Sequence, residues 1–86
     1  VKAALKQGQL QLGCAFGMIP SPEVARILAA AGFHWTFIDG EHGSFGTETL
    51  ASLSGACARA GLCPIVRVAD LQYSLIARSL DNGAQG

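Results

Sequence analysis

The feature that most constrains this fold is a recurring boundary, in which a helical pattern stops at a glycine and an apolar segment follows. It reads A-A-G-F from Ala30, R-A-G-L from Arg59 and D-N-G-A from Asp81. After the first two boundaries, a strand-like segment begins within two or three residues. Strand starts thus recur about every 20 to 30 residues, the length of one strand plus one helix. The repeat predicts an α/β fold with a parallel sheet and right-handed crossovers.

The elements expected from this pattern cover most of the chain. Strands are predicted over residues 10–18, 33–38 and 63–68, and the second is apolar enough to be covered on both faces. Helices are predicted over residues 2–7, 21–31, 47–60 and 70–81, with Ser21 and Asp70 as N-caps. The expected buried stripes are Val24, Ile27, Leu28 and Ala31; Leu50, Leu53 and Cys57; and Leu71, Leu75, Ile76 and Leu80. Phe16, Phe33, Trp35 and Phe37 are expected in the core, and His34 in a structural role.

Two architectures fit the alternation, a doubly wound open sheet and a (β/α)₈ barrel. Gly13 and Gly17 are too far apart for the G-x-G-x-x-G turn of a dinucleotide-binding domain. Polar residues cluster after the second and third strands, where barrels place catalytic groups, so we prefer the barrel. A whole barrel needs about 250 residues. The chain has 86 residues, starts with Val1 and stops at Gly86, where a strand ought to begin. We therefore expect residues 1–86 to be a fragment of one barrel domain, a partial TIM barrel with three βα units and the start of a fourth strand.

Composition excludes several classes of function. Half of the residues are hydrophobic, 14% are charged and the formal net charge is zero, so no basic patch is available for nucleic acid. No apolar run approaches the roughly 18 residues of a membrane span, and the first residues lack a signal-peptide core, so the expected location is the cytoplasm. The three cysteines have no metal-type spacing and are expected to be small buried side chains.

The stretch W-T-F-I-D-G-E-H from Trp35 carries the densest chemistry, because a buried strand ends there in two acids and an imidazole. His42 can act as a general base, or it can be a solvated loop histidine. Asp39 can cap the loop, support His42 or hold a metal-bound water. Glu41 is a weaker candidate that more often faces solvent.

Arg67 stands inside the apolar run I-V-R-V of the third strand. A guanidinium there requires an anionic partner, because it cannot shed its charge. A structural carboxylate such as Asp39 or Asp70 could serve. We favour the alternative, a carboxylate or enolate substrate bound through two hydrogen bonds.

The strings S-P-E-V-A-R-I-L-A-A-A-G-F-H-W-T-F-I-D-G-E-H-G, C-P-I-V-R-V and L-D-N-G-A-Q-G together resemble the N-terminal third of the metal-dependent class II pyruvate aldolases. These are the 4-hydroxy-2-oxoheptanedioate and 2-dehydro-3-deoxyglucarate aldolases, related to the citrate lyase β-subunit. The resemblance covers essentially the whole chain. It implies a (β/α)₈ barrel that reversibly cleaves 4-hydroxy-2-oxo acids to pyruvate and an aldehyde. It also implies a small-molecule 2-oxo acid substrate and a homo-oligomer, a hexamer, whereas the composition predicts no nucleic-acid or membrane partner.

The resemblance also implies roles for residues of this chain. His42 matches the general base, and Arg67 the arginine that binds the substrate and stabilises the enolate. Asp81 matches an acid that raises the basicity of the histidine. A helix end lies on the opposite face of a barrel, so either Asp81 reaches His42 across a subunit boundary or that role does not carry over to this chain. Asp39 matches an acid near the metal-bound water.

Two departures from the family follow. The resemblance implies a divalent metal cofactor, Mg²⁺, Mn²⁺ or Co²⁺, whose glutamate and aspartate ligands would lie beyond Gly86, so no metal ligand is expected in this chain. His34 stands where the family has an acid in G-F-D-W. A non-catalytic barrel used for binding or assembly, or another enolate-forming lyase of the superfamily, is the alternative function.

Overall fold

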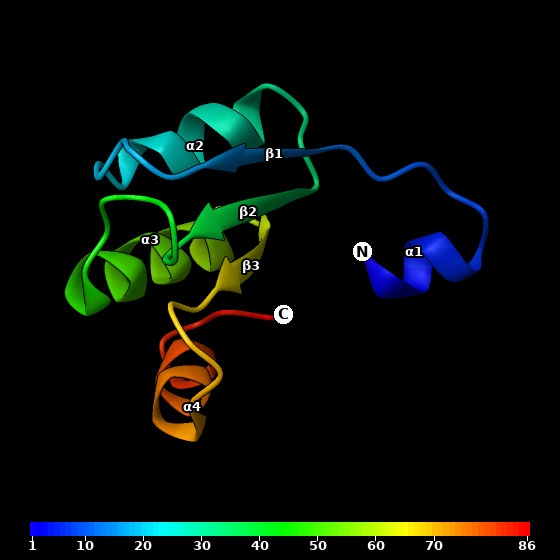
Figure 1. Cartoon of the computed structure of the whole chain (residues 1–86). Coiled ribbons are helices and arrows are strands. Elements are labelled where there is room, and N and C mark those ends of the chain that lie inside the picture. Colours follow the sequence, from blue (N-terminus) through cyan, green and yellow to red (C-terminus); the bar gives the residue numbers. More distant parts are fainter.

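The computed structural model describes residues 1–86 as a three-stranded parallel sheet with one helix packed on one of its faces and a further helix on each side of that helix (Figure 1). The strands are β1 (Gly13–Phe16), β2 (Trp35–Asp39) and β3 (Cys63–Arg67), hydrogen-bonded in the order β1-β2-β3. The helices are α1 (Lys2–Lys6), α2 (Glu23–Ala30), α3 (Thr47–Arg59) and α4 (Tyr73–Asp81). None of them is long and apolar enough to cross a membrane. The predicted α/β alternation is confirmed.

The three predicted glycine stops are confirmed, and Gly8 ends the first helix in the same way. Gly8, Gly32, Gly61 and Gly83 have φ values of 75°, 91°, 85° and 110°. Side chains with a Cβ rarely adopt this left-handed conformation, so the glycines allow each helix to end and the chain to turn back.

Several element boundaries differ from the prediction by one or two residues, and the starts of β1 and α4 differ by three. β1 begins at Gly13 rather than Leu10, because its first partner, Trp35, is also the first residue of β2. Helix α4 begins at Tyr73, since Asp70 forms a separate turn before it: its carboxylate accepts the N–H of Leu71 at 2.7 Å, and its backbone oxygen accepts the N–H of Gln72 at 2.8 Å.

The core lies between the sheet and the helices. Ile38 of β2 and Leu53 and Cys57 of α3 have no exposed surface, and Thr36 is equally buried. Thr36 Oγ1 donates to the Cys14 carbonyl oxygen at 2.7 Å, which satisfies its hydroxyl inside the core. Burial raises the pKa of the Cys57 thiol, whereas Cys14 and Cys63 are only half-buried.

Two predicted helix stripes are partly wrong. In α2 the buried residue is Ala25, and Ile27 is 63% exposed. In α4, Ile76 and Leu80 are exposed, as is Leu71 before the helix. Periodicity identifies the apolar face of a helix, but burial also requires a neighbouring element, and α4 contacts little besides the edge of α3.

The other face of the sheet is open, and two aromatic residues expected in the core lie on it. Trp35 and Phe37 alternate with the buried Thr36 and Ile38, so they point away from the helices. The Trp35 indole lies over Gly13, where an added Cβ would be 2.1 Å from the ring. Phe16 and Phe33, in contrast, pack against the core.

The amino end of β2 and the last residues of the chain are fixed by backbone contacts. The Leu12 N–H donates to His34 Nδ1 at 3.0 Å, which confirms the structural role of that histidine. At the carboxyl end of the chain, the Gln85 N–H donates to the Pro64 oxygen at 2.8 Å, and the Val66 N–H to the Gly86 oxygen at 3.0 Å. Residues 84–86 thus run beside β3, although they do not form a strand.

Candidate functional site

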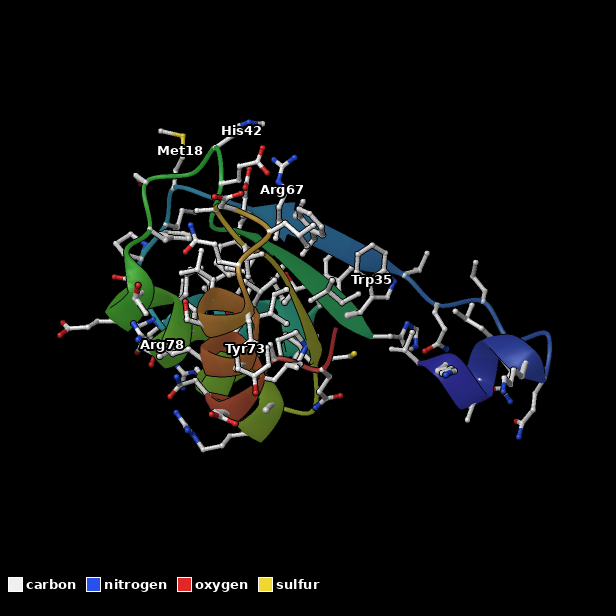
Figure 2. The ribbon with its side chains drawn as sticks, turned by 60° about the horizontal axis from the view of Figure 1, so that its bottom comes forward. Met18, Trp35, His42, Arg67, Tyr73 and Arg78 are labelled. Atoms are coloured by element: carbon white, nitrogen blue, oxygen red, sulfur yellow. The ribbon has the colours of Figure 1, made fainter.

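The candidate site lies where β2 and β3 end, on the open face of the sheet. Asp39 and Arg67 are the last residues of these strands and are register partners in the parallel ladder. Figure 2 shows Arg67 and His42 at the same end of the molecule. The prediction that the polar residues after these two strands meet at one edge is therefore confirmed for Asp39, Glu41, His42 and Arg67.

Asp39 and Arg67 form a two-pronged ion pair. Arg67 Nε donates to Asp39 Oδ1 at 3.0 Å, and Nη2 to Oδ2 at 2.6 Å. Hydrogen bonding from Arg67, helped by the His42 N–H, holds the pKa of Asp39 well below its usual value, and the same carboxylate raises the pKa of Arg67. The partner of Arg67 in the structure is a carboxylate of the protein, the alternative to a substrate carboxylate or enolate. This carboxylate belongs to Asp39 and not to Asp70.

Asp39 also shapes the loop that follows β2. Its Oδ1 accepts the backbone N–H groups of Glu41 and His42, both at 3.0 Å. This is an Asx-type turn, in which the carboxylate replaces backbone acceptors for two successive residues. The predicted loop-capping role of Asp39 is therefore confirmed, and its contact with His42 is to the backbone rather than the ring.

The same loop is packed tightly against the end of β1. A Cβ on Gly43 would lie 2.4 Å from the Asp39 backbone oxygen and 2.5 Å from that of Gly17, so only glycine fits. The Ser44 N–H donates to the Gly17 oxygen at 2.9 Å. Phe45 anchors the far side of the loop in the core, edge-on to Phe16 with ring centroids 5.9 Å apart. His42 is thus carried on a loop fixed at both ends.

The imidazole of His42 is open to ligands. Its side chain is 67% exposed, and Nε2 lies 2.9 Å from Glu41 Oε1. Nδ1 has no protein partner. A carboxylate beside an exposed imidazole is the arrangement used to orient a general base. The carboxylate next to the His42 ring is that of Glu41, which the sequence indicates as the weakest candidate of Asp39, Glu41 and His42.

Arg67 retains donors for a ligand. Its side chain is 38% exposed, and Nη1 makes no hydrogen bond within the chain. The guanidinium carbon lies 5.6 Å from the centroid of the Phe37 ring. Asp39 and Phe37 thus hold one edge and one face of the guanidinium, while the other edge stays accessible.

Asp81 is separate from this cluster within the chain. It is the last residue of α4, is exposed, and makes no ion pair or side-chain hydrogen bond with the other candidates. The chain returns from α4 to the middle of β3, where Gln85 and Gly86 bond to Pro64 and Val66. Asp81 therefore lies toward the opposite end of the sheet from His42.

The residues of this chain do not form a metal centre by themselves. No three His, Cys, Asp or Glu side chains lie close enough to hold an ion. Both Asp39 oxygens are engaged by Arg67 and backbone amides, which leaves them poor ligands for a cation. The arrangement instead offers a positive hydrogen-bond donor next to a potential base, as needed to stabilise an anion formed by proton transfer.

Sequence reasoning missed the residues that support the site. The sequence predicts Phe37 in the core. Phe37 stands two residues before Asp39 on the same strand, however, and this spacing places both side chains on one face of the sheet. The contact of Gly17 with Gly43 joins residues 26 positions apart in sequence. Its only signal in the sequence is a glycine directly after β1 and another in the loop after β2.

Over most of its length the chain resembles proteins of the HpcH/HpaI aldolase/citrate lyase family. The chain superposes on an HpcH/HpaI aldolase from Desulfitobacterium hafniense DCB-2 with a TM-score of 0.89 and 27% identity, over 98% of this chain and 32% of that one. It superposes on the citrate synthase SbnG with a TM-score of 0.85 and 37% identity, over 100% of this chain and 35% of that one. No protein-family model matches the chain.

Relatives found by sequence agree. The chain is 38% identical over 82 residues to proteins named 5-keto-4-deoxy-D-glucarate aldolase from Salmonella paratyphi A and Salmonella newport, which covers 95% of this chain and 32% of each relative. The resemblance to this aldolase family is therefore confirmed over most of the 86 residues. The chain spans about a third of the length of the relatives it matches. Its parallel α/β fold agrees with part of a barrel-like aldolase.

Proposed function

We propose that the protein to which this chain belongs is a divalent-metal-dependent aldolase. It reversibly cleaves 4-hydroxy-2-oxo acids to pyruvate and an aldehyde. The observation that carries the proposal is the joint placement of Arg67 and His42 around Asp39, in a chain 38% identical to named aldolases over 95% of its length.

The geometry supports a role for each residue in this reaction. His42 accepts the proton of the substrate 4-hydroxyl, the C3–C4 bond breaks, and C4 leaves as the carbonyl carbon of the aldehyde. The electron pair of that bond moves into the 2-oxo group and gives the pyruvate enolate. Arg67 donates to the oxygen where this negative charge develops. Protonation of the enolate at C3 by the imidazolium returns His42 to its neutral form and releases pyruvate.

The proposed metal, Mg²⁺, Mn²⁺ or Co²⁺, is assigned to residues outside this chain. The cluster around Asp39 does not fit a cation, because its carboxylate is fully engaged by Arg67 and backbone amides. We assign the ligands to a glutamate and an aspartate of the longer protein, as the family resemblance implies.

The remaining proposals concern architecture. Residues 1–86 would form three βα units and the start of a fourth strand in a single (β/α)₈ barrel domain of a cytoplasmic protein. The barrel would assemble as a hexamer. Asp81 would then act on His42 of a neighbouring subunit, since within one chain it lies toward the other end of the sheet.

A substrate screen tests the proposal. The intact protein is incubated with Mg²⁺, Mn²⁺ or Co²⁺ and a series of 4-hydroxy-2-oxo acids, and pyruvate is measured by coupled reduction to lactate. Pyruvate release that requires both the metal and His42 supports the aldolase. Absence of release with every acid and metal refutes it, and leaves the non-catalytic barrel as the better explanation.

A second candidate is an enzyme that uses the same enolate chemistry on another substrate class. The similarity to the citrate synthase SbnG, 37% identical over the whole chain, favours it. Arg67 would stabilise an enolate in either reaction, so the site itself does not separate the two. Adding a thioester and phosphoenolpyruvate to the same screen does.

A further inference from the structure

Phe37 is a large aromatic side chain that the core does not use. It lies in β2 between the buried residues Thr36 and Ile38, and therefore points to the open face of the sheet. It does not belong to the apolar cluster formed with the helices. Phe37 is half-buried, and the helix-side core does not account for its position, so the contacts that it makes on its own face of the sheet do.

The contact that Phe37 makes is with Arg67. In the parallel register Phe37 faces Ile65, and Asp39 faces Arg67, so Phe37 and Arg67 are diagonal neighbours on one face. Long and aromatic side chains reach each other across such a diagonal. The guanidinium carbon lies 5.6 Å from the ring centroid, within the range of a cation–π contact.

The ring and the carboxylate restrain different motions of the guanidinium. Asp39 binds Nε and Nη2, which fixes the fork within its own plane. A guanidinium that is hydrogen-bonded along one edge can still rotate out of its plane. The Phe37 ring packs against one face of the Arg67 guanidinium and limits this rotation. The ion pair with Asp39 and the contact with the Phe37 ring together fix the direction in which Nη1 points, and Nη1 itself stays unpaired.

We propose that Phe37 is a positioning residue, which holds Arg67 so that its free edge meets the oxygens of a pyruvate-like ligand. The inference rests on the proposed function, because it gives Arg67 an enolate or carboxylate to bind. It adds to the site an apolar residue from the middle of β2, whereas the polar members lie at the ends of β2 and β3 or in the loop after β2.

The test compares three variants of the intact protein. Phe37→Leu keeps an apolar side chain but removes the ring quadrupole, whereas Phe37→Tyr keeps both. Trp35→Leu is the matched control: it removes an aromatic ring from the same face of the same strand, where the ring lies over Gly13 rather than Arg67. Oxalate, a stable mimic of the pyruvate enolate, is titrated by calorimetry in the presence of Mn²⁺, and KM and kcat are measured for pyruvate release.

Phe37→Leu is expected to raise the Kd for oxalate and the KM by about two- to five-fold, the factor that corresponds to one partly exposed cation–π contact. Phe37→Tyr should restore both values. Trp35→Leu removes packing against Gly13 but no contact with Arg67, so it should lower the melting temperature without changing the oxalate Kd. If Phe37→Leu binds oxalate as tightly as the wild type, or changes only in parallel with Trp35→Leu, the positioning role is refuted while the aldolase stands. A wild-type protein that neither binds oxalate nor releases pyruvate refutes the proposed function itself.

Discussion

Replacing Gly43 with alanine is expected to displace the loop that carries His42. The added Cβ would lie 2.4 Å from the Asp39 oxygen and 2.5 Å from the Gly17 oxygen, and Cβ atoms essentially never approach closer than 3.0 Å. The loop must therefore move by about 0.6 Å, the difference between 3.0 and 2.4 Å. Neither contact can relax by a side-chain rotation, since both oxygens belong to the backbone of ordered strand ends.

Two magnitudes follow from this displacement. Overpacking of this kind costs about 1 to 3 kcal/mol of unfolding free energy. A misplacement of 1 Å can cost about 100-fold in rate, so a shift of roughly half that size predicts a fall in kcat/KM on the order of 10-fold. The loss should appear mainly in kcat, because His42 acts on the bound substrate.

The assay is pyruvate release by the intact protein, with urea unfolding of the same samples. Gly46→Ala is the control, because it lies in the same loop, has nothing within 4 Å of the added Cβ and has a φ of −82° that alanine adopts freely. Its rate should stay within about two-fold of wild type, as is usual for a substitution without strain. Wild-type rate and stability in Gly43→Ala would show that the loop is not held as described.

Four further substitutions test the site and the core. Asp39→Asn should lower the free energy of unfolding at neutral pH. Arg67 depresses the pKa of Asp39 in the folded state, so the ionised carboxylate stabilises the wild type. The difference in unfolding free energy between wild type and variant is therefore complete above the unfolded pKa of about 3.9, and it shrinks as the pH falls below that value. Urea titrations at several pH values check this, and a difference that persists unchanged in acid contradicts it. His42→Asn should reduce kcat/KM by about 100-fold or more, with an unchanged melting temperature because the side chain is 67% exposed. Leu53→Ala should cost about 2 to 5 kcal/mol, since Leu53 is fully buried, whereas Leu80→Ala, at 51% exposure, should cost under about 0.5 kcal/mol; equal losses would disprove the assigned core.

Local signals in the sequence predicted the elements well. The positions where the helices end require a positive φ, which few residues other than glycine adopt, and the three stops predicted from the repeated boundary are confirmed. The acids and the histidine after β2, and the arginine at the end of β3, could be placed at one edge because the carboxyl ends of parallel strands coincide.

Burial and side-chain pairing depend on neighbouring elements, so they could not be predicted from local sequence signals. The apolar pattern of α4 is genuine, but no other helix of the chain covers Ile76 or Leu80. Similarly, alternation along β2 was hidden because both of its faces carry apolar residues, and only the packing shows that Thr36 rather than Phe37 is inside. The choice of Asp39 over Asp70 as the partner of Arg67 depends on the strand register, which sequence does not specify.

The most direct test of the account is enolate formation itself, independent of any aldehyde. The intact protein, with Mg²⁺, Mn²⁺ or Co²⁺, is incubated with pyruvate in D₂O, and loss of the methyl proton signal is followed by NMR. The account predicts metal-dependent exchange of the C3 protons, reduced about 100-fold or more in Arg67→Ala because the donor to the developing charge is lost. Exchange at the buffer rate with every metal, or an equal rate in Arg67→Ala, would contradict it.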